Sequence, residues 1–113
     1  MLFRSGVSQA TVDRGEVPAR VVKLPLATNP RAKMGGFRDG FVKVFARPGT
    51  GLVLGGVVVA PRASELILPV SLAVEQRLTV DQMAQTFAVY PSLSGSLTEA
   101  ARTVMEFGTD AIA

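Results

Sequence analysis

The stretch that decides the fold is FVKVFARPGTGLVLGGVVVA, residues 41–60. Its first six residues alternate between two sides, one carrying Phe41, Lys43 and Phe45 and the other Val42, Val44 and Ala46. A period of two is typical of a strand with one face on a core. The run 48–51, Pro-Gly-Thr-Gly, favours a turn, and an apolar segment from 52 to 60 follows it. Residues 41–60 therefore predict an antiparallel hairpin, with a bulge or a close backbone approach at Gly55-Gly56.

Shorter elements are expected between the N-terminus and this hairpin. Ser8 is placed to cap a short helix that Gly15 would end. Residues 19–26 alternate well enough for a second strand, and Pro25 indicates that this strand lies at a sheet edge or ends there. Residues 29–36, from Asn-Pro to Gly-Gly, are expected to form a connector rich in turns.

After residue 62 the hydrophobic period becomes that of an amphipathic helix. Apolar residues recur three and four apart at Ala63, Leu66, Ile67, Val70, Ala73 and Val74. Pro69 interrupts this run and predicts either a kink or a new helix that starts with Pro69 at its first position. Because strands come first and helices later, without βαβ alternation, the sequence predicts one α+β domain over residues 1–113.

Two capping boxes predict two more helices. The sequence Thr-Val-Asp-Gln at 79–82 opens one helix, whose inward residues are expected to be Val80, Met83, Ala84 and Phe87. Residues 90–95, Tyr-Pro-Ser-Leu-Ser-Gly, are non-helical by composition. The sequence Ser-Leu-Thr-Glu at 96–99 is expected to open the last helix, which runs toward Phe107 with Gly108 beyond its end.

The composition excludes several kinds of protein. The 113 residues are 48% hydrophobic and 19% charged, which suits one globular core. Cysteine and histidine are both absent, so the chain has no disulfide, no thiol nucleophile, no histidine base and none of the usual zinc or iron–sulfur ligands. The net charge of +3 is a small surplus without a basic tract, so nucleic acid is not an expected partner.

The lengths and positions of the apolar segments indicate whether membrane insertion or secretion is expected. The longest apolar run, residues 51–60, is far short of the ~18 residues that span a bilayer. The first residues lack the apolar core of a signal peptide. No membrane association is expected, and a cytoplasmic protein is the default expectation.

The residues alone reveal no catalytic apparatus. Ser92 and Ser94 have no base near them in the sequence and are more simply turn and capping residues. Tyr90, extended before Pro91, is expected to be a half-buried aromatic residue, with hydrogen bonding to a ligand as the alternative.

A set of motifs in a fixed order resembles one family, from Gly6 to about Phe107. The motifs are Gly-Val-Ser-Gln-Ala at 6–10, Asn-Pro-Arg-Ala at 29–32, Gly-Phe-Val-Lys at 40–43, Leu-Gly-Gly at 54–56, Ala-Ser-Glu-Leu-Ile at 63–67, Leu-Thr-Val at 78–80 and Tyr-Pro-Ser-Leu-Ser-Gly at 90–95. Together they resemble the C-terminal dimerisation domain of the pyridine nucleotide-disulfide oxidoreductases, FAD enzymes that include dihydrolipoamide dehydrogenase and glutathione reductase.

The last motif departs from the family at two positions. The family has His-Pro-Thr-Leu-Ser-Glu there, and the resemblance implies that the His is an acid/base for the partner subunit's active-site thiol and that the Glu orients it. Tyr90 and Gly95 replace that pair, and a phenol, whose ordinary pKa is about 10, is a poor proton shuttle at neutral pH. No catalytic residue is therefore expected in this chain, which resembles the branch of NAD(P)H-dependent quinone reductases. Tyr90 and Pro91 would still approach the flavin of the partner subunit.

The resemblance also implies what is missing from these 113 residues. The family's FAD- and NAD(P)-binding domains precede this domain, so FAD and NAD(P)H belong to the full-length enzyme and neither is expected on this chain alone. The domain's first strand is expected upstream of Gly6, which makes the chain a fragment truncated at its N-terminus. The alternative is a free-standing structural or protein-interaction module without catalysis.

A homodimer is the expected assembly. The apolar helical run is assigned to the two-fold seam, because a two-fold interface needs one self-complementary patch. The residues assigned to the seam are Ala63, Ile67, Val70, Val74 and Phe87. The helix expected over 96–107 is the second choice for this interface.

Overall fold

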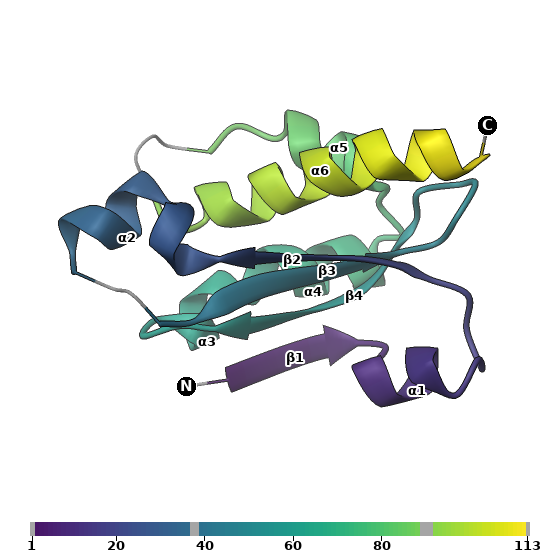
Figure 1. Ribbon diagram of the computed structural model, residues 1–113, viewed down its shortest axis with the longest axis horizontal. Helices are drawn as coiled ribbons and strands as arrows, with labels where there is room; N and C mark the ends of the chain where they lie inside the picture. The colour runs from purple at the N-terminus through teal and green to yellow at the C-terminus, as the bar shows by residue number, and fades with distance from the viewer. Residues whose placement is uncertain (1, 37–38, 89–91, 113) are drawn as a thin grey trace.

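A computed structural model, which describes residues 2–36, 39–88 and 92–112, contains one four-stranded antiparallel sheet with helices (Figure 1). The strands are β1 (Leu2–Gly6), β2 (Arg20–Pro25), β3 (Phe41–Ala46) and β4 (Val53–Val59), and their spatial order is β1-β4-β3-β2. The predicted α+β class is confirmed, and β2 lies at the edge that Pro25 indicated.

The first strand of the sheet lies within the chain. β1 pairs with β4 from Leu2↔Val59 to Gly6↔Gly55, so the expectation that this strand would be missing is wrong. The motif at 6–10 begins where β1 ends, and the segment before it is long enough for a short edge strand.

The predicted hairpin is confirmed by the pairing of β3 with β4. Phe45 pairs with Gly55 and Ala46 with Val53, which leaves Leu54 as an extra residue in β4 and makes a bulge one residue before the expected Gly55-Gly56. The expected close approach is also present, because a Cβ on Gly55 would lie 2.5 Å from the Ser5 carbonyl oxygen. Glycine is required where β1 and β4 come this close.

One face of the sheet is covered by helices (Figure 1). The predicted new helix is present: α3 (Ala63–Leu66) and α4 (Leu68–Glu75) are separated at Ile67, and Pro69 is the second residue of α4, one position later in the helix than expected. α5 (Val80–Gln85) and α6 (Gly95–Ile112) follow. α4 packs on β4 and β1, and α6 packs on β2 and β3. The core between these helices and the sheet contains fully buried side chains from both layers, among them Val42, Val44, Val58, Val70 and Leu97.

The turn-rich connector expected at residues 29–36 contains a helix instead. After β2 come a 3-10 helix, Leu26–Thr28, and then α2 (Pro30–Met34). Asn29 caps α2, because its Oδ1 accepts hydrogen bonds from the backbone N–H groups of Arg31 and Ala32. Asparagine before a proline in the first helical turn is a helix-start signal, which explains the difference.

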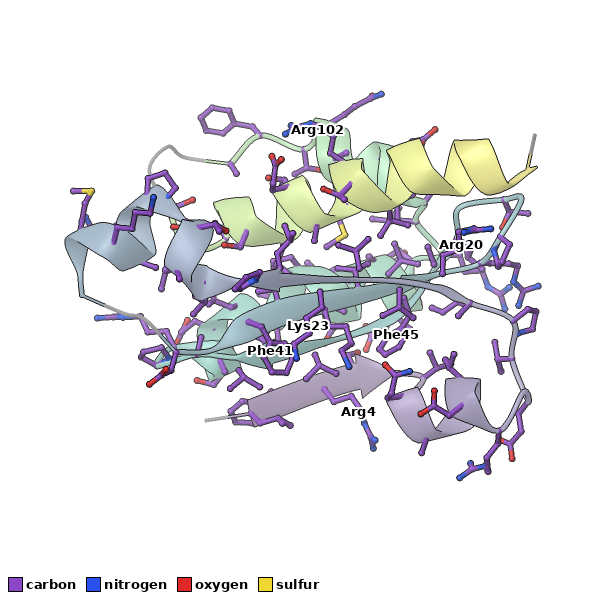
Figure 2. All side chains as sticks on the ribbon, viewed as in Figure 1. Arg4, Arg20, Lys23, Phe41, Phe45 and Arg102 are labelled. Atoms are coloured by element: carbon purple, nitrogen blue, oxygen red, sulfur yellow. The ribbon has the colours of Figure 1, made fainter. Side chains whose placement is uncertain are left out.

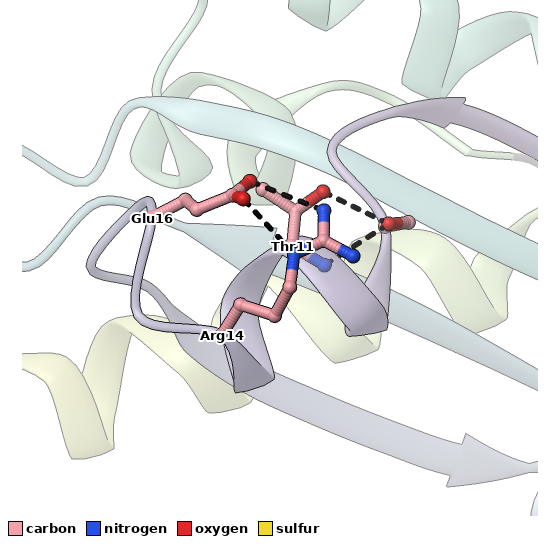
Figure 3. Close-up of polar contacts among 4 residues, drawn as sticks. Thr11, Arg14 and Glu16 are labelled. Carbon is pink, nitrogen blue, oxygen red and sulfur yellow. Dashed lines mark hydrogen bonds and ion pairs between the residues drawn. The ribbon is translucent and has the colours of Figure 1, made fainter.

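The first helix, α1 (Gln9–Asp13), is capped by Ser8 as predicted. Thr11 donates its backbone N–H to Ser8 Oγ, at 3.2 Å, and the two hydroxyls lie 3.0 Å apart. Beyond the helix, Arg14 and Glu16 form an exposed ion pair with an Nε–Oε1 distance of 2.9 Å (Figure 3). An exposed pair of this kind contributes at most about 1 kcal/mol, so the cap is the main local stabiliser of α1.

The second face of the sheet is partly open. It carries Lys23, Phe41, Phe45 and Arg4, with α1 at one corner (Figure 2). Lys23 Nζ lies 4.2 Å from the centre of the Phe41 ring, and Lys43 donates to Gln9 Oε1 of α1 at 3.0 Å. Among the described residues no helix is long and apolar enough to cross a membrane.

Candidate functional site

The segment that leads into α6 is fixed by one buried side chain, Asn29. The Asn29 Nδ2 donates to the carbonyl oxygen of Ser92, at 3.0 Å, and to the hydroxyl of Ser96, at 2.6 Å. Ser92 Oγ in turn accepts the backbone N–H of Gly95 at the first residue of α6. The 3-10 helix that follows β2, the start of α2 and the start of α6 therefore meet at Asn29.

This arrangement corrects the expected start of the last helix. α6 begins at Gly95, not after a capping box at 96–99, and Ser96 is a buried hydrogen-bond partner of Asn29 instead of a cap. The helix continues to Ile112, past Gly108, where it was expected to end. Ser92 supplies the local capping contact, and its spacing from Gly95 is that of a side-chain cap.

The three predicted residues of the last motif have different outcomes. Tyr90 and Pro91 lie outside the described residues. Gly95 opens α6, and a Cβ built on it would meet only Ser92 Oγ, at 3.6 Å, which is ordinary contact. Position 95 has room for a side chain, and glycine brings no acidic group there.

An apolar groove lies between α4, α5 and the start of α6. Its walls include Pro69 and Leu72 from α4, Met83 from α5 and Leu97 from α6, and its volume is about 220 Å³. Large hydrophobic side chains stand exposed around it: Leu72 is 48% exposed and Phe87 is 87% exposed. Exposed apolar side chains gathered around a groove are typical of an interaction surface.

The residues assigned to the dimer seam separate into two groups. Ala63 and Val70 are fully buried in the core of the chain itself, so they have no surface to offer a partner, and this part of the assignment is corrected. Ile67 and Val74 are half-buried and pack against the same core. The stripe of residues that recur three and four apart faces the sheet, as the inner face of an amphipathic helix does.

Phe87 also differs from one expectation. It was predicted to point inward from its helix, but α5 ends at Gln85 and Thr86 is extended, with φ −69° and ψ 135°. This turn of the chain carries Phe87 out of the core, and the inward residues of α5 are Val80 and Met83. Its assignment to a seam is compatible with this exposure.

The described residues do not form the kind of site that binds a dinucleotide cofactor. Such a site needs a glycine-rich turn that leads directly into a helix N-terminus, where the pyrophosphate lies. The glycines from 51 to 56 lead into and lie within β4 instead, and the chain there is strand paired on both sides. In the described part of the chain no group of three acidic side chains is placed to hold a metal ion.

Three comparisons with known proteins agree with this geometry. The sequence profile of the pyridine nucleotide-disulphide oxidoreductase dimerisation domain matches residues 4–101. NAD(P)H dehydrogenase (quinone) of Mycobacterium tuberculosis is 64% identical over 100 residues, which are 88% of this chain and 20% of that protein. Dihydrolipoyl dehydrogenase of Haloferax volcanii is 33% identical over 100 residues, 88% of this chain and 21% of that protein.

The fold of this chain is also similar to those of solved structures. The crystal structure of LpdA from Mycobacterium tuberculosis superposes with a TM-score of 0.90 at 62% identity, over 92% of this chain and 23% of that one. The Cu(II) complex of the HOCl-induced flavoprotein disulfide reductase RclA from Escherichia coli gives a TM-score of 0.84 at 25% identity, over 91% and 23% of the two chains.

The fold, the motif order and these matches define a domain of flavin-dependent disulfide reductases. The chain belongs to the pyridine nucleotide-disulfide oxidoreductase family, as its dimerisation domain. It spans about a fifth of the length of the curated relatives that it matches.

Asn29 is the site residue that sequence reasoning missed. It was assigned to a turn, although Asn followed by Pro at a helix start is a recognisable signal for the α2 cap. Its contacts with Ser92 and Ser96 join residues 63 and 67 positions apart, and no local pattern predicts such contacts.

Proposed function

We propose that this chain serves as the dimerisation domain of an FAD-dependent NAD(P)H oxidoreductase of the quinone reductase type, within a cytoplasmic homodimer. The single observation that carries this proposal is the 64% identity to NAD(P)H dehydrogenase (quinone) of Mycobacterium tuberculosis. The dihydrolipoyl dehydrogenases among the relatives are much less similar, at 33% identity for that of Haloferax volcanii.

The chemistry of the last motif favours quinone reduction over disulfide exchange. Dithiol–disulfide exchange needs a proton acceptor for the thiol, and Tyr90 and Gly95 stand where the family has a histidine and a glutamate. Electron transfer from a reduced flavin to a quinone makes no such demand on this domain. Tyr90 and Pro91 then serve as packing against the flavin edge of the partner subunit.

The groove between α4 and α5 supports self-association through an exposed surface. Leu68 and Leu72 lie one helical turn apart on α4 and are 58% and 48% exposed, while Val70 and Ala73 on the opposite side of α4 are buried. Phe87 and Leu72 both line the groove. The seam that we propose therefore consists of Leu68, Leu72 and Phe87 with the half-buried Ile67 and Val74, and it replaces the buried part of the earlier assignment.

A domain exchange tests the proposed activity. The corresponding 100 residues of the Mycobacterium tuberculosis NAD(P)H dehydrogenase (quinone) are replaced by this chain, with the unaltered enzyme and an exchange that carries Leu72→Asp as controls. The exchanged enzyme is expected to be dimeric and flavin-loaded, with NAD(P)H–quinone turnover within about tenfold of the parent, which corresponds to roughly 1.4 kcal/mol. A dimeric, flavin-loaded exchange enzyme without quinone turnover would refute the assignment.

A further inference from the structure

Three cationic side chains form a row across the face of the sheet opposite the helices α3 to α6. Arg4 of β1 and Lys43 of β3 both pair with Val57 of β4, and Lys23 of β2 pairs with Lys43. Because directly opposed residues of neighbouring strands point to the same side of a sheet, all three cations lie on one face (Figure 2). We call Arg4, Lys23 and Lys43 the basic row.

The electrostatics of the basic row are unfavourable within the chain itself. Lys23 and Lys43 are directly opposed on neighbouring strands, a placement in which like charges destabilise a sheet. Uncharged groups hold both amines: Lys23 Nζ lies 4.2 Å from the centre of the Phe41 ring, and Lys43 Nζ donates to Gln9 Oε1 at 3.0 Å. Neither of the two ion pairs formed by the described residues includes a member of the row. The described part of the chain therefore offers the row no neutralising carboxylate.

A shallow groove beside the basic row adds apolar contact area. It lies between β1, β3 and α1, its volume is about 590 Å³, and Arg4 and Lys43 line it together with Leu2, Phe41 and Val57. Leu2 is 60% exposed. Cations next to exposed apolar side chains suit a protein segment that carries carboxylates, because complementary charge selects the partner and apolar contact adds affinity.

The length of the basic row favours an extended segment over a single small anion. Neighbouring strands are about 4.8 Å apart, so the row extends over roughly 14 Å from β1 to β2. An extended peptide advances about 3.3 Å per residue and points alternate side chains to one side, so roughly five residues cover this length. A segment of that size that crosses the strands presents about three side chains to the row.

We propose that the basic row binds an extended acidic segment of a protein partner, whose alternate carboxylates face Arg4, Lys43 and Lys23. A second copy of this chain does not suit this face, because it would bring two basic rows together. The seam proposed around Leu72 lies on the other side of the sheet, where α4 packs on β4 and β1 (Figure 1). The inference is therefore independent of self-association and goes beyond the proposed function.

The test is an NMR titration of the full chain with the peptide acetyl-Glu-Ser-Glu-Ser-Glu-amide at constant ionic strength. The row variant replaces all three cations of the basic row with glutamine. The matched control variant carries Arg31→Gln, Lys33→Gln and Arg62→Gln, at exposed side chains that do not line the groove. Both variants lose three positive charges from a net charge of +3, so they differ only in the place from which charge is removed.

We expect the peptide to shift backbone amide resonances of β1, β2 and β3 in the unaltered chain. The Kd of the control variant should stay within about twofold of that of the unaltered chain, and the Kd of the row variant should rise about tenfold. Arg4→Gln alone, at an exposed side chain, should raise Kd about threefold, and it supplies the measurement if the row variant does not fold.

Several outcomes would overturn the proposal. Absence of binding to the unaltered chain is one, and equal Kd values for the row and control variants are another, because net charge alone would then drive binding. Inorganic phosphate that shifts the same resonances as strongly as the peptide would show a site for a single anion. Phosphatidylserine vesicles that bind the chain when the peptide does not would assign the face to a lipid surface. A monomeric chain that still binds the peptide through the row counts against the proposed seam alone.

Discussion

Val70 of α4 lies directly above Gly56 of β4, so close that a Cβ on Gly56 would stand 2.9 Å from Val70 Cγ1 and 2.8 Å from the Lys43 carbonyl oxygen. At this point α4 packs directly against the backbone of β4, because Gly56 has no side chain between them. Gly56 pairs with Val44 on one side and Ser5 on the other, so the strand cannot move aside without disturbing both neighbours. The close helix–sheet packing of this domain depends on glycine at position 56.

Gly56→Ala is expected to destabilise the chain by about 1–3 kcal/mol, because the new methyl group overpacks a core that has no room for it. Thermal unfolding followed by circular dichroism measures the loss. Gly95→Ala is the matched control, since its Cβ would meet only Ser92 Oγ at 3.6 Å. Equal melting temperatures for the two variants would show that α4 does not press on β4 as described.

Lys23 and Phe41 are expected to couple across the open face of the sheet. The 4.2 Å separation of Lys23 Nζ from the ring centre places a cation over an aromatic face, which is worth about 0.5–1 kcal/mol at an exposed site. A double-mutant cycle of Lys23→Gln and Phe41→Leu, read by urea unfolding, measures this coupling free energy. The cycle repeated with Lys33→Gln, a lysine of α2, should give no coupling, and a zero value in both cycles would exclude the cation–π contact.

The sequence predicted the parts of this fold that depend on local pattern. The alternation at 41–46 and the glycines after Pro48 predicted the hairpin, and Pro69 predicted the division between α3 and α4. These features follow from the periodicity of apolar side chains and from the backbone restrictions of single residues. Both can be recognised in the sequence without knowledge of tertiary contacts.

Several of the errors concern features that distant contacts decide. β1 forms because Leu2–Gly6 pairs with the edge of β4 that β3 does not occupy. Ser96 is buried where it hydrogen-bonds to Asn29, a residue 67 positions earlier in the sequence. The sequence pattern of an apolar stripe such as that containing Val70 also does not show whether the stripe packs on the chain's own sheet or on a partner, since a core face and an interface face are both apolar. The resemblance to a family identified the domain, but the structure was needed to place Leu72 and Phe87 on the surface.

The isolated chain is expected to remain colourless after purification in excess FAD. Tight binding of the cofactor needs pyrophosphate contacts at a helix N-terminus and an acidic residue for the ribose, and the glycines near 51–56 serve a hairpin instead. Absorbance near the flavin band after gel filtration measures retention. A yellow protein with stoichiometric FAD would refute this expectation.

The mass of the chain in solution tests the central claim, which is self-association through the surface of α4 around Leu72. Sedimentation at micromolar concentration is expected to give twice the 11.9 kDa of one chain. Leu72→Asp should give a monomer with an unchanged fold, because a carboxylate buried at a seam costs several kcal/mol and about 1.4 kcal/mol is a tenfold change in Kd. Met34→Asp, at a side chain of α2 that is 67% exposed, should leave the dimer intact. A monomer for the unaltered chain, or a dimer that persists in Leu72→Asp, would contradict the account.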